Sequence, residues 1–162
     1  MLPENLKDNS IAAAVDAFDS EAIRAGNTDR SELTLEIAAG KIASVCGFLK
    51  YDQKFVRLST VTAVDRYPAE PRFEVVYHLH SIERNERVRL KCRLRGEDPA
   101  IESVTGVWRG ANWYEREVFD FFGIRFRNHP DLRRIMMPDD WEGHPLRKDY
   151  PVHGYKYSYP NE

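Results

Sequence analysis

The chain has 162 residues, a length that suits one domain with a hydrophobic core and an appendage. Hydrophobic residues make up 42% and charged residues 31% of the sequence, as in ordinary soluble globular proteins. The formal net charge of −2 argues against a dedicated nucleic-acid-binding protein, which normally carries a strong basic excess. No apolar run approaches the roughly 20 residues that a bilayer-spanning helix needs, and no secretory signal is visible, so a cytoplasmic location is expected.

The two cysteines limit the redox chemistry that the chain itself can carry. Cys46 and Cys92 are far apart in the sequence, and neither belongs to a CxxC pair. Two isolated thiols cannot supply the four ligands of an iron–sulfur cluster, and a disulfide is not expected in a reducing compartment. If the protein takes part in electron transfer, we therefore expect the electrons to travel on other subunits.

The N-terminal part of the chain predicts two helices and one strand. Apolar residues recur at spacings of three and four over positions 10–24, which predicts an amphipathic helix that is ended by Gly26. Alternation of apolar and polar residues over positions 33–37 predicts a short strand. Helical spacing returns over positions 39–49 and places Cys46 on an apolar helix face.

Three strands are predicted next, over residues 55–65, 73–82 and 87–95. The last has the clearest pattern, because apolar side chains alternate with a basic stripe. The stripe consists of Arg87, Arg89, Lys91, Arg93 and Arg95. A period of two with one polar face is typical of an antiparallel sheet whose other face is covered by helices. We therefore predict an α+β fold for residues 1–122, a two-layer domain with a mainly antiparallel sheet covered by helices.

The basic stripe has more than one interpretation. A solvated outer face of the sheet is the simplest, because the alternation requires polar residues there. A docking surface for an acidic partner is the main alternative. Nucleic acid or anionic lipid is the weakest, since no aromatic residues are interleaved for base stacking.

An aromatic stretch follows, and it predicts a helix over residues 113–122 that is closed by the next glycine. Asn112 and Glu115 match a capping-box pattern at its start. Apolar groups occupy most of its circumference, so we expect burial on more than one side. Arg116 and Asp120 are spaced i, i+4 and are predicted to pair.

The last segment, residues 123–162, shows no persistent helical or strand period, and prolines recur too often for regular secondary structure. Its composition is nevertheless not that of a disordered tail, because aromatic and large apolar residues are frequent. A structureless stretch of this length is improbable inside a compact domain. We therefore predict a long extended C-terminal tail that docks on partner subunits.

The tail holds possible metal ligands, but not at a recognisable spacing. These residues are His129, Asp131, His144, Asp149 and His153. Their separations match none of the usual zinc patterns, and the chain has neither a nucleophile elbow nor a glycine-rich phosphate loop. A free-standing metal-dependent hydrolase that uses His129, His144 and Asp149 is therefore kept only as a remote alternative.

Residues 115–150 read EREVFDFFGIRFRNHPDLRRIMMPDDWEGHPLRKDY, and this string resembles the signature of the C-subunit family of respiratory complex I. The strings TAVDRYP, at residues 62–68, and FEVVYHLHSI, at residues 73–82, are also similar to that family. Matches at many spaced positions make the resemblance more specific than any short motif. It covers most of the chain from about residue 55.

The resemblance implies a structural, cofactor-free and non-catalytic subunit in the hydrophilic arm of a proton-pumping NADH–quinone oxidoreductase. NADH, FMN, iron–sulfur clusters and quinone are then expected on other subunits. The chain would lie against the D subunit, which helps to form the quinone site, and near the iron–sulfur subunits B and I. It would lie at the cytoplasmic face of the inner membrane, without a span of its own. The equivalent subunit of a related membrane-bound hydrogenase, or of an oxidoreductase with another electron donor, is the alternative.

The resemblance also implies which residues meet the partner subunits. Basic side chains would donate charge-assisted hydrogen bonds to partner carboxylates or carbonyls, and large apolar side chains would serve as anchors. Prolines would lower the entropy that is lost when the tail becomes ordered. The predicted interface residues are Glu115, Arg116, Asp120, His129, Pro130, Arg133, Arg134, Trp141, His144, Pro145, Leu146, Arg147, Lys148, Asp149 and Tyr150.

Overall fold

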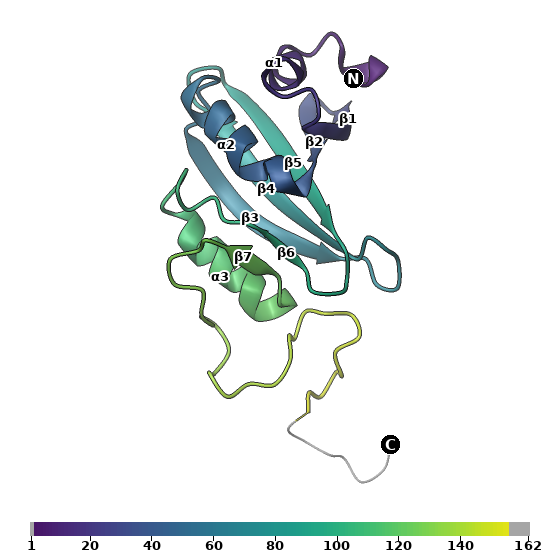
Figure 1. Cartoon of the computed structure of the whole chain (residues 1–162), viewed down its shortest axis with the longest axis vertical. Coiled ribbons are helices and arrows are strands. Elements are labelled where there is room, and N and C mark those ends of the chain that lie inside the picture. The colour runs from purple at the N-terminus through teal and green to yellow at the C-terminus, as the bar shows by residue number, and fades with distance from the viewer. Residues whose placement is uncertain (1, 156–162) are drawn as a thin grey trace.

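A five-stranded sheet with strand order β1-β2-β5-β4-β3 forms the centre of the computed structural model, which describes residues 2–155 (Figure 1). The strands are β1 (Ile23–Asp29), β2 (Glu32–Ile37), β3 (Arg57–Asp65), β4 (Phe73–Ser81) and β5 (Glu86–Leu94). Neighbouring strands are antiparallel except β2 and β5, which run parallel. The predicted mainly antiparallel sheet is therefore confirmed, and β3, β4 and β5 lie where the sequence predicts strands, over residues 55–65, 73–82 and 87–95.

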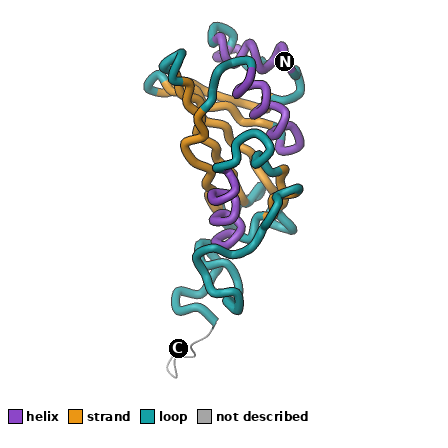
Figure 2. Tube along the Cα trace, turned by 90° about the vertical axis from the view of Figure 1, so that its left-hand side faces the viewer, coloured by secondary structure: helices purple, strands orange, loops and turns teal. Residues whose placement is uncertain are grey.

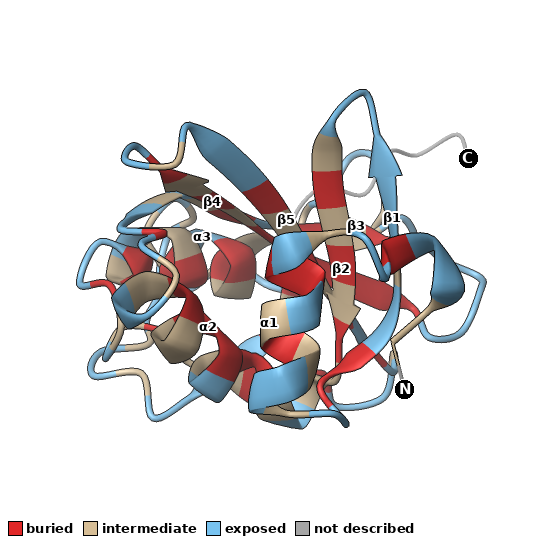
Figure 3. Ribbon diagram, turned by 90° about the horizontal axis from the view of Figure 1, so that it is seen from above, coloured by how far each residue is buried: buried red, intermediate tan, exposed pale blue. Residues whose placement is uncertain are grey.

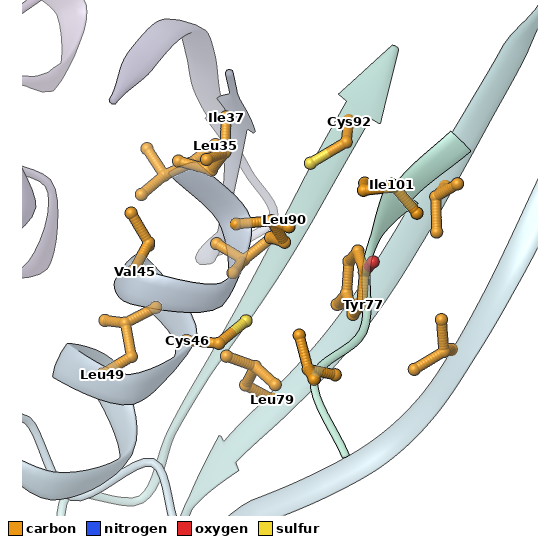
Figure 4. Close-up of a cluster of buried hydrophobic side chains, with 14 of the residues drawn as sticks. Leu35, Ile37, Val45, Cys46, Leu49, Tyr77, Leu79, Leu90, Cys92 and Ile101 are labelled. Carbon is orange, nitrogen blue, oxygen red and sulfur yellow. The ribbon is translucent and has the colours of Figure 1, made fainter. Parts of the chain in front are cut away.

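Helices cover one face of this sheet, and the opposite face carries none of the three α-helices (Figure 3). The helices are α1 (Ser10–Phe18), α2 (Ile42–Tyr51) and α3 (Ala111–Phe122), with short 3-10 helices η1 (Glu4–Leu6) and η2 (Ala39–Lys41) before α1 and α2. The core lies between the two layers, where Val45, Cys46 and Leu49 of α2 face apolar side chains of the strands (Figure 4). Cys46 is fully buried there, as predicted.

The N-terminal helix is shorter than the apolar spacing predicts. It ends at Phe18, and residues 23–29 form strand β1 instead. Gly26 lies inside this strand rather than after a helix, so the predicted helix end is wrong. A Cβ at Gly26 would lie only 2.7 Å from the backbone oxygen of Thr34, so the glycine permits close packing of β1 on β2. Pairing with β2 makes this polar segment a strand, and such pairing is not visible in local spacing.

A second, small sheet lies beside α3. Strand β6 (Ala100–Glu102) pairs in parallel with β7 (Arg125–Arg127), and α3 connects them. The prediction that no strand occurs after position 123 is therefore wrong for β7. Three residues are too few to show a period of two, so this strand could not be predicted from alternation.

Beyond β7 the described chain runs to position 155 without a helix or strand (Figure 2). It passes around the C-terminal end of α3, as Figure 1 shows. This irregular course agrees with the predicted tail; its remaining part, residues 156–162, lies outside the described residues. Within residues 2–155, no helix combines the length and the apolar character that a bilayer span requires.

Candidate partner interface around helix α3

Helix α3 buries side chains on two sides, as the sequence predicts. Glu115, Val118 and Phe122 are buried on one side, and Arg116 and Asp120 on the other. The second side is covered by the tail. The predicted glycine closure is also confirmed, because the residue after Phe122 adopts a left-handed conformation with φ +71° and donates its N–H to the carbonyl of Phe119 at 2.8 Å.

Asp120 is the centre of the contacts between α3 and the tail. Its carboxylate is fully buried and accepts the backbone N–H groups of Ile135, Met136 and Met137 at 2.8–3.0 Å. Arg134 donates to the other carboxylate oxygen at 2.7 Å. Burial by itself would raise the pKa of Asp120, but these donors outweigh it and hold the pKa below its usual value. The charged carboxylate therefore fixes the path of the tail across the helix.

Arg134 continues this network into the tail. Besides its bonds to Asp120, it donates to the backbone oxygens of Trp141 at 3.0 Å and Gly143 at 2.9 Å. A planar guanidinium has several donors in a fixed geometry, so it can bond to acceptors of three residues at once; an amine fixes the directions of its bonds less well. The Arg134 side chain therefore holds the end of the loop over residues 135–143 next to its beginning.

Arg116 does not pair with Asp120, so the predicted i, i+4 pair is wrong. It donates instead to the backbone oxygens of residues 133–134 at 3.1 and 3.2 Å, and its guanidinium lies 5.1 Å from the ring centroid of Trp113. Asp120 meets its partners in a segment more than ten residues away, and such tertiary donors override a helical spacing rule worth only about 0.2–0.5 kcal/mol.

The C-terminal carbonyl groups of α3 are satisfied by the tail. His144 Nδ1, the N–H of Leu146 and Nε of Arg147 bond to the backbone oxygens of residues 120–122 in turn, at 2.9, 3.1 and 2.7 Å. An α-helix leaves its last carbonyls without partners in the helix, and a cation there is favourable. Burial lowers the pKa of His144, so the neutral ring donates its Nδ1 proton. Residues 144–147 therefore cap α3.

A second anchor holds the tail to the sheet. Arg72 donates two hydrogen bonds to Asp65 at 2.8 and 2.9 Å and two to Asp149 at 2.6 and 3.0 Å. The backbone N–H of Lys148 donates to Asp65 at 2.8 Å. Burial would raise the pKa of Asp65, but Arg72 and the backbone donors lower it to about 2. Asp65 is therefore charged, and the tail is joined to the edge strand β3.

This anchor was missed by sequence reasoning. Asp65 lies in the string TAVDRYP that resembles the family, and Arg72 directly precedes the next similar string. Their partner Asp149 is 77 residues from Arg72, so no local spacing connects them. An acidic residue at the end of a strand, with an arginine just before the next strand, was the available signal.

Glu115 holds a loop rather than the start of its own helix. The residue before α3 is Gly110, which makes no side-chain cap bond, and the predicted capping box is wrong. Glu115 is fully buried and accepts from the hydroxyl of Ser103 at 2.6 Å and from the N–H of Val104 at 2.7 Å. Burial outweighs these donors and raises the pKa of Glu115 to about 7.

His129 lies next to this carboxyl. Its Nε2 is 3.9 Å from Glu115 and 3.2 Å from the backbone oxygen of Asn112, while its Nδ1 accepts the N–H of Asp131 at 3.0 Å. The accepting Nδ1 leaves the proton on Nε2, which donates to the carbonyl. Burial lowers the pKa of His129, so the ring is neutral at neutral pH. The ring thereby joins the start of the tail to α3.

Replacing Glu115 by glutamine is expected to flatten the pH dependence of stability. The folded chain keeps the Glu115 proton up to a pKa of about 7, whereas the unfolded chain releases it near pH 4.5, so this contribution is complete below pH 4.5 and is lost as the pH rises to 7. At about 1.4 kcal/mol for each pKa unit between 4.5 and 7, this contribution is at most about 3.5 kcal/mol. The glutamine variant should therefore be about 1–3 kcal/mol more stable than the parent at pH 8.

The measurement is urea denaturation at pH 5 and pH 8. Glutamine can keep both contacts, since its oxygen accepts from Val104 and its amide donates to the Ser103 hydroxyl. His129 is present in both proteins, so the difference between them isolates Glu115. Equal losses of stability in the two proteins between pH 5 and pH 8 would show that Glu115 is ionised in the folded chain.

The remaining predicted interface residues are less enclosed. Pro130, Arg133, Leu146 and Lys148 are exposed, and Trp141, Pro145 and Tyr150 are half-buried. The tail also exposes large apolar side chains that the sequence prediction did not single out. These side chains are Met136, which is 65% exposed, Tyr155, which is 59% exposed, and Val152. Whether the predicted residues contact a partner stays a prediction, although many of them are bonded within the chain.

Comparisons with known proteins agree on one family. A family described as "Respiratory-chain NADH dehydrogenase, 30 Kd subunit" matches residues 35–156. The C subunit of the NADH-quinone oxidoreductase of Geobacter sulfurreducens is 52% identical over 126 residues, which cover 77% of this chain and 78% of the relative. The protein of the same name from Cereibacter sphaeroides is 43% identical over 156 residues, which cover 95% of this chain and 76% of the relative.

Two solved structures share the fold. A trypsin-resistant fragment of Nqo5 is 28% identical, with a TM-score of 0.64 over 74% of this chain and 96% of that chain. A chain of the membrane-bound sulfane sulfur reductase, an archaeal respiratory membrane complex, is also 28% identical, with a TM-score of 0.75 over 88% of this chain and 84% of that chain. The resemblance seen in the sequence is thus confirmed, and the chain belongs to the family of the 30-kDa subunit of respiratory-chain NADH dehydrogenase, which in bacteria is the C subunit of NADH–quinone oxidoreductase.

Proposed function

We propose that the chain is a structural subunit in the hydrophilic arm of a proton-pumping NADH–quinone oxidoreductase, and that it supports assembly and electron transfer without catalytic residues of its own. The observation that carries this proposal is the 52% identity, over 77% of the chain, to a protein named as a subunit of that enzyme. NADH, FMN, the iron–sulfur clusters and quinone are assigned to other subunits. Both cysteines are buried in the core, which agrees with a packing role for the thiols.

The partners in this proposal are the quinone-site D subunit and the iron–sulfur subunits B and I. The tail, residues 123–162, is assigned as the docking element and residues 1–122 as the supporting domain. The tail is already bonded to α3 and β3 through Asp120, Arg147 and Asp149, so little ordering entropy is lost on docking. Its exposed apolar side chains are then the groups that a partner would cover.

We place the subunit at the cytoplasmic face of the inner membrane, as a peripheral part of the complex. The similar sulfane sulfur reductase chain belongs to a membrane-bound complex, which supports a membrane-associated host. The alternative host, a related hydrogenase or an oxidoreductase with another donor, is less favoured, because the NADH–quinone relatives are about 50% identical and the sulfane sulfur reductase chain 28%.

The metal-dependent hydrolase gains no support from the geometry of its residues. His129, His144 and Asp149 are bonded to Asn112, Asp120 and Arg72, respectively. Over the part of the chain that the structure describes, no group of three or more His, Cys, Asp or Glu side chains is arranged to hold a metal ion.

Replacing Leu146 by serine is expected to weaken docking while leaving the chain folded. Leu146 is 52% exposed, and the contact that places it is made by its backbone N–H to the carbonyl of Phe121. Removing an exposed apolar anchor at an interface costs about 1–2 kcal/mol, or roughly five- to thirtyfold in affinity. The measurement is the yield of the D, B and I subunits with the tagged variant from native membranes.

The matched control is Tyr51→Ser. It removes another large side chain, which is 60% exposed and lies at the C-terminal end of α2, outside the tail. The control should retrieve the same subunits as the parent chain. Unchanged retrieval by the Leu146 variant would place the docking surface elsewhere on the molecule. Thermal denaturation of both variants checks that each is folded.

A further inference from the structure

The helix-free face of the sheet is hollowed at one end. A hollow of about 490 Å³ lies over the end of the sheet where β3 begins and β4 ends. The polar side chains that line it come from four strands. They are Glu32, Arg57, Ser59, Thr60, His78, His80, Arg87 and Arg89. Figure 3 shows all three α-helices on the opposite side of the sheet, so none of them covers this hollow.

The strand register explains why these side chains gather. In the strand register, His80 of β4 lies opposite Arg57 of β3 on one side and opposite Arg87 of β5 on the other. These three residues therefore form a row across the sheet. His78 is paired in the same way with Thr60 and Arg89, and forms the next row. On β4 and β5 the residues of the two rows are two apart and therefore point to the same face. On β3 the register shifts between Leu58 and Thr60, so Arg57 and Thr60, which are three apart, join the same two rows.

The hollow carries more positive than negative charge. Of the residues that line it, three are arginines and one is a carboxylate. Glu32 pairs with Arg89 at 3.2 Å and lies 3.9 Å from Arg87. Arg57 is exposed and forms no ion pair with any carboxylate among residues 2–155. One glutamate cannot neutralise three guanidinium groups, so an acidic ligand would be attracted here.

The shape and lining of the hollow favour a protein segment over other anions. The hollow is only partly enclosed, whereas sites for small molecules enclose most of their ligand. No Phe, Tyr or Trp side chain lines it, so it lacks the large aromatic rings on which nucleic-acid bases usually stack. A planar guanidinium can donate two parallel hydrogen bonds to the carboxylate of aspartate or glutamate, and the sheet holds the arginine backbones in fixed positions.

We propose that this hollow binds an acidic segment, rich in aspartate and glutamate, of another subunit of the same complex. The proposal rests on the proposed function, since it takes the partner from the assembly. It adds a contact that is separate from the tail. Arg57 begins β3 and Asp65, which anchors the tail, ends it; the two are about 25 Å apart at 3.3 Å per residue.

The test uses carbodiimide, which joins an amine directly to a carboxylate. Arg57→Lys and Arg87→Lys keep the charge and place an amine at each position. The complex that carries either variant is purified from native membranes, treated with carbodiimide, digested and examined by mass spectrometry. Arg24→Lys, which changes an exposed arginine of β1 outside the hollow, is the matched control.

We expect cross-links from positions 57 and 87 to aspartate or glutamate residues of another subunit, and a several-fold loss of these cross-links at about 0.5 M salt, where charges are screened beyond about 4 Å. The control variant should give no such cross-links. A complex that assembles normally but shows cross-links only to Glu32 of the same chain, or none, overturns the proposal and leaves the proposed function standing. A parent chain that retrieves no oxidoreductase subunits overturns the proposed function itself.

Discussion

Replacing Asp120 by asparagine is expected to lower the free energy of unfolding of the chain by about 3–5 kcal/mol. The carboxylate is fully buried, and it accepts three backbone N–H groups and the Arg134 guanidinium. An amide has one acceptor oxygen, and its NH₂ group would face donors. Arg134 would then remain largely buried without a counter-charge, which is the costly way to break a buried ion pair.

Urea denaturation of the full chain measures this effect. Glu117→Gln is the matched control, because it neutralises an exposed carboxylate of the same helix and should change stability by less than about 0.5 kcal/mol. Limited proteolysis adds a local measurement: cleavage within residues 133–143 should become faster in the Asp120 variant. A loss below about 1 kcal/mol, with unchanged cleavage, would mean that Asp120 does not hold the tail.

Replacing Arg72 by alanine is expected to cost a similar amount, about 3–5 kcal/mol, because it leaves the Asp65 carboxylate buried without its main counter-charge. Asp149 is partly exposed and can turn to water, so Asp149→Ala should cost only about 1 kcal/mol. A double-mutant cycle between Arg72 and Asp149 isolates their coupling. We expect the double variant to lose less stability than the sum of the two single variants, because the two side chains share two hydrogen bonds that either substitution removes.

The pH dependence of stability measures the contact between Arg72 and Asp65 independently. The pKa of Asp65 is lowered to about 2, so its contribution is complete above pH 4 and is lost as the pH falls toward 2. In Arg72→Ala the pKa of Asp65 should rise, and the loss of stability on acidification between pH 4 and pH 2 should be smaller than in the parent. An identical acid profile in the two proteins would contradict the assigned role of Arg72.

The sequence predicted those parts of the fold whose signals are local. Strands β4 and β5 alternate apolar and polar residues, and β3 is rich in valine and threonine. Helix α3 is bounded by a glycine that adopts the conformation expected of a closing residue. Strand β1 is mostly polar, and β6 and β7 have three residues each. These elements depend on pairing with distant strands, and no local pattern reports such pairing.

The roles of the site residues were harder to predict for a different reason. Asp120, Arg134, His144 and Arg147 were singled out as partner contacts, and in the structure they bond the tail to α3. A charged side chain in an irregular segment has the same signature whether its acceptor lies in its own chain or in a partner. The sequence therefore predicts which residues matter more readily than which atoms they contact.

Internal bonding also changes how the tail should be tested. Removing residues 124–162 would leave Asp120 without its tail donors and the last carbonyls of α3 without their cap. A truncated chain that failed to bind could therefore simply be misfolded. Point variants of exposed tail residues such as Leu146 avoid this ambiguity, because the network beneath them is retained.

The most direct test of the proposed function is purification of the affinity-tagged full-length chain from native membranes, with mass spectrometry and an assay of NADH oxidation by quinone on the same sample. We expect that the D, B and I subunits are retrieved with the chain, and that the sample oxidises NADH with quinone as acceptor. Recovery of the chain alone, or with a complex that does not oxidise NADH, would show that the proposed function is wrong.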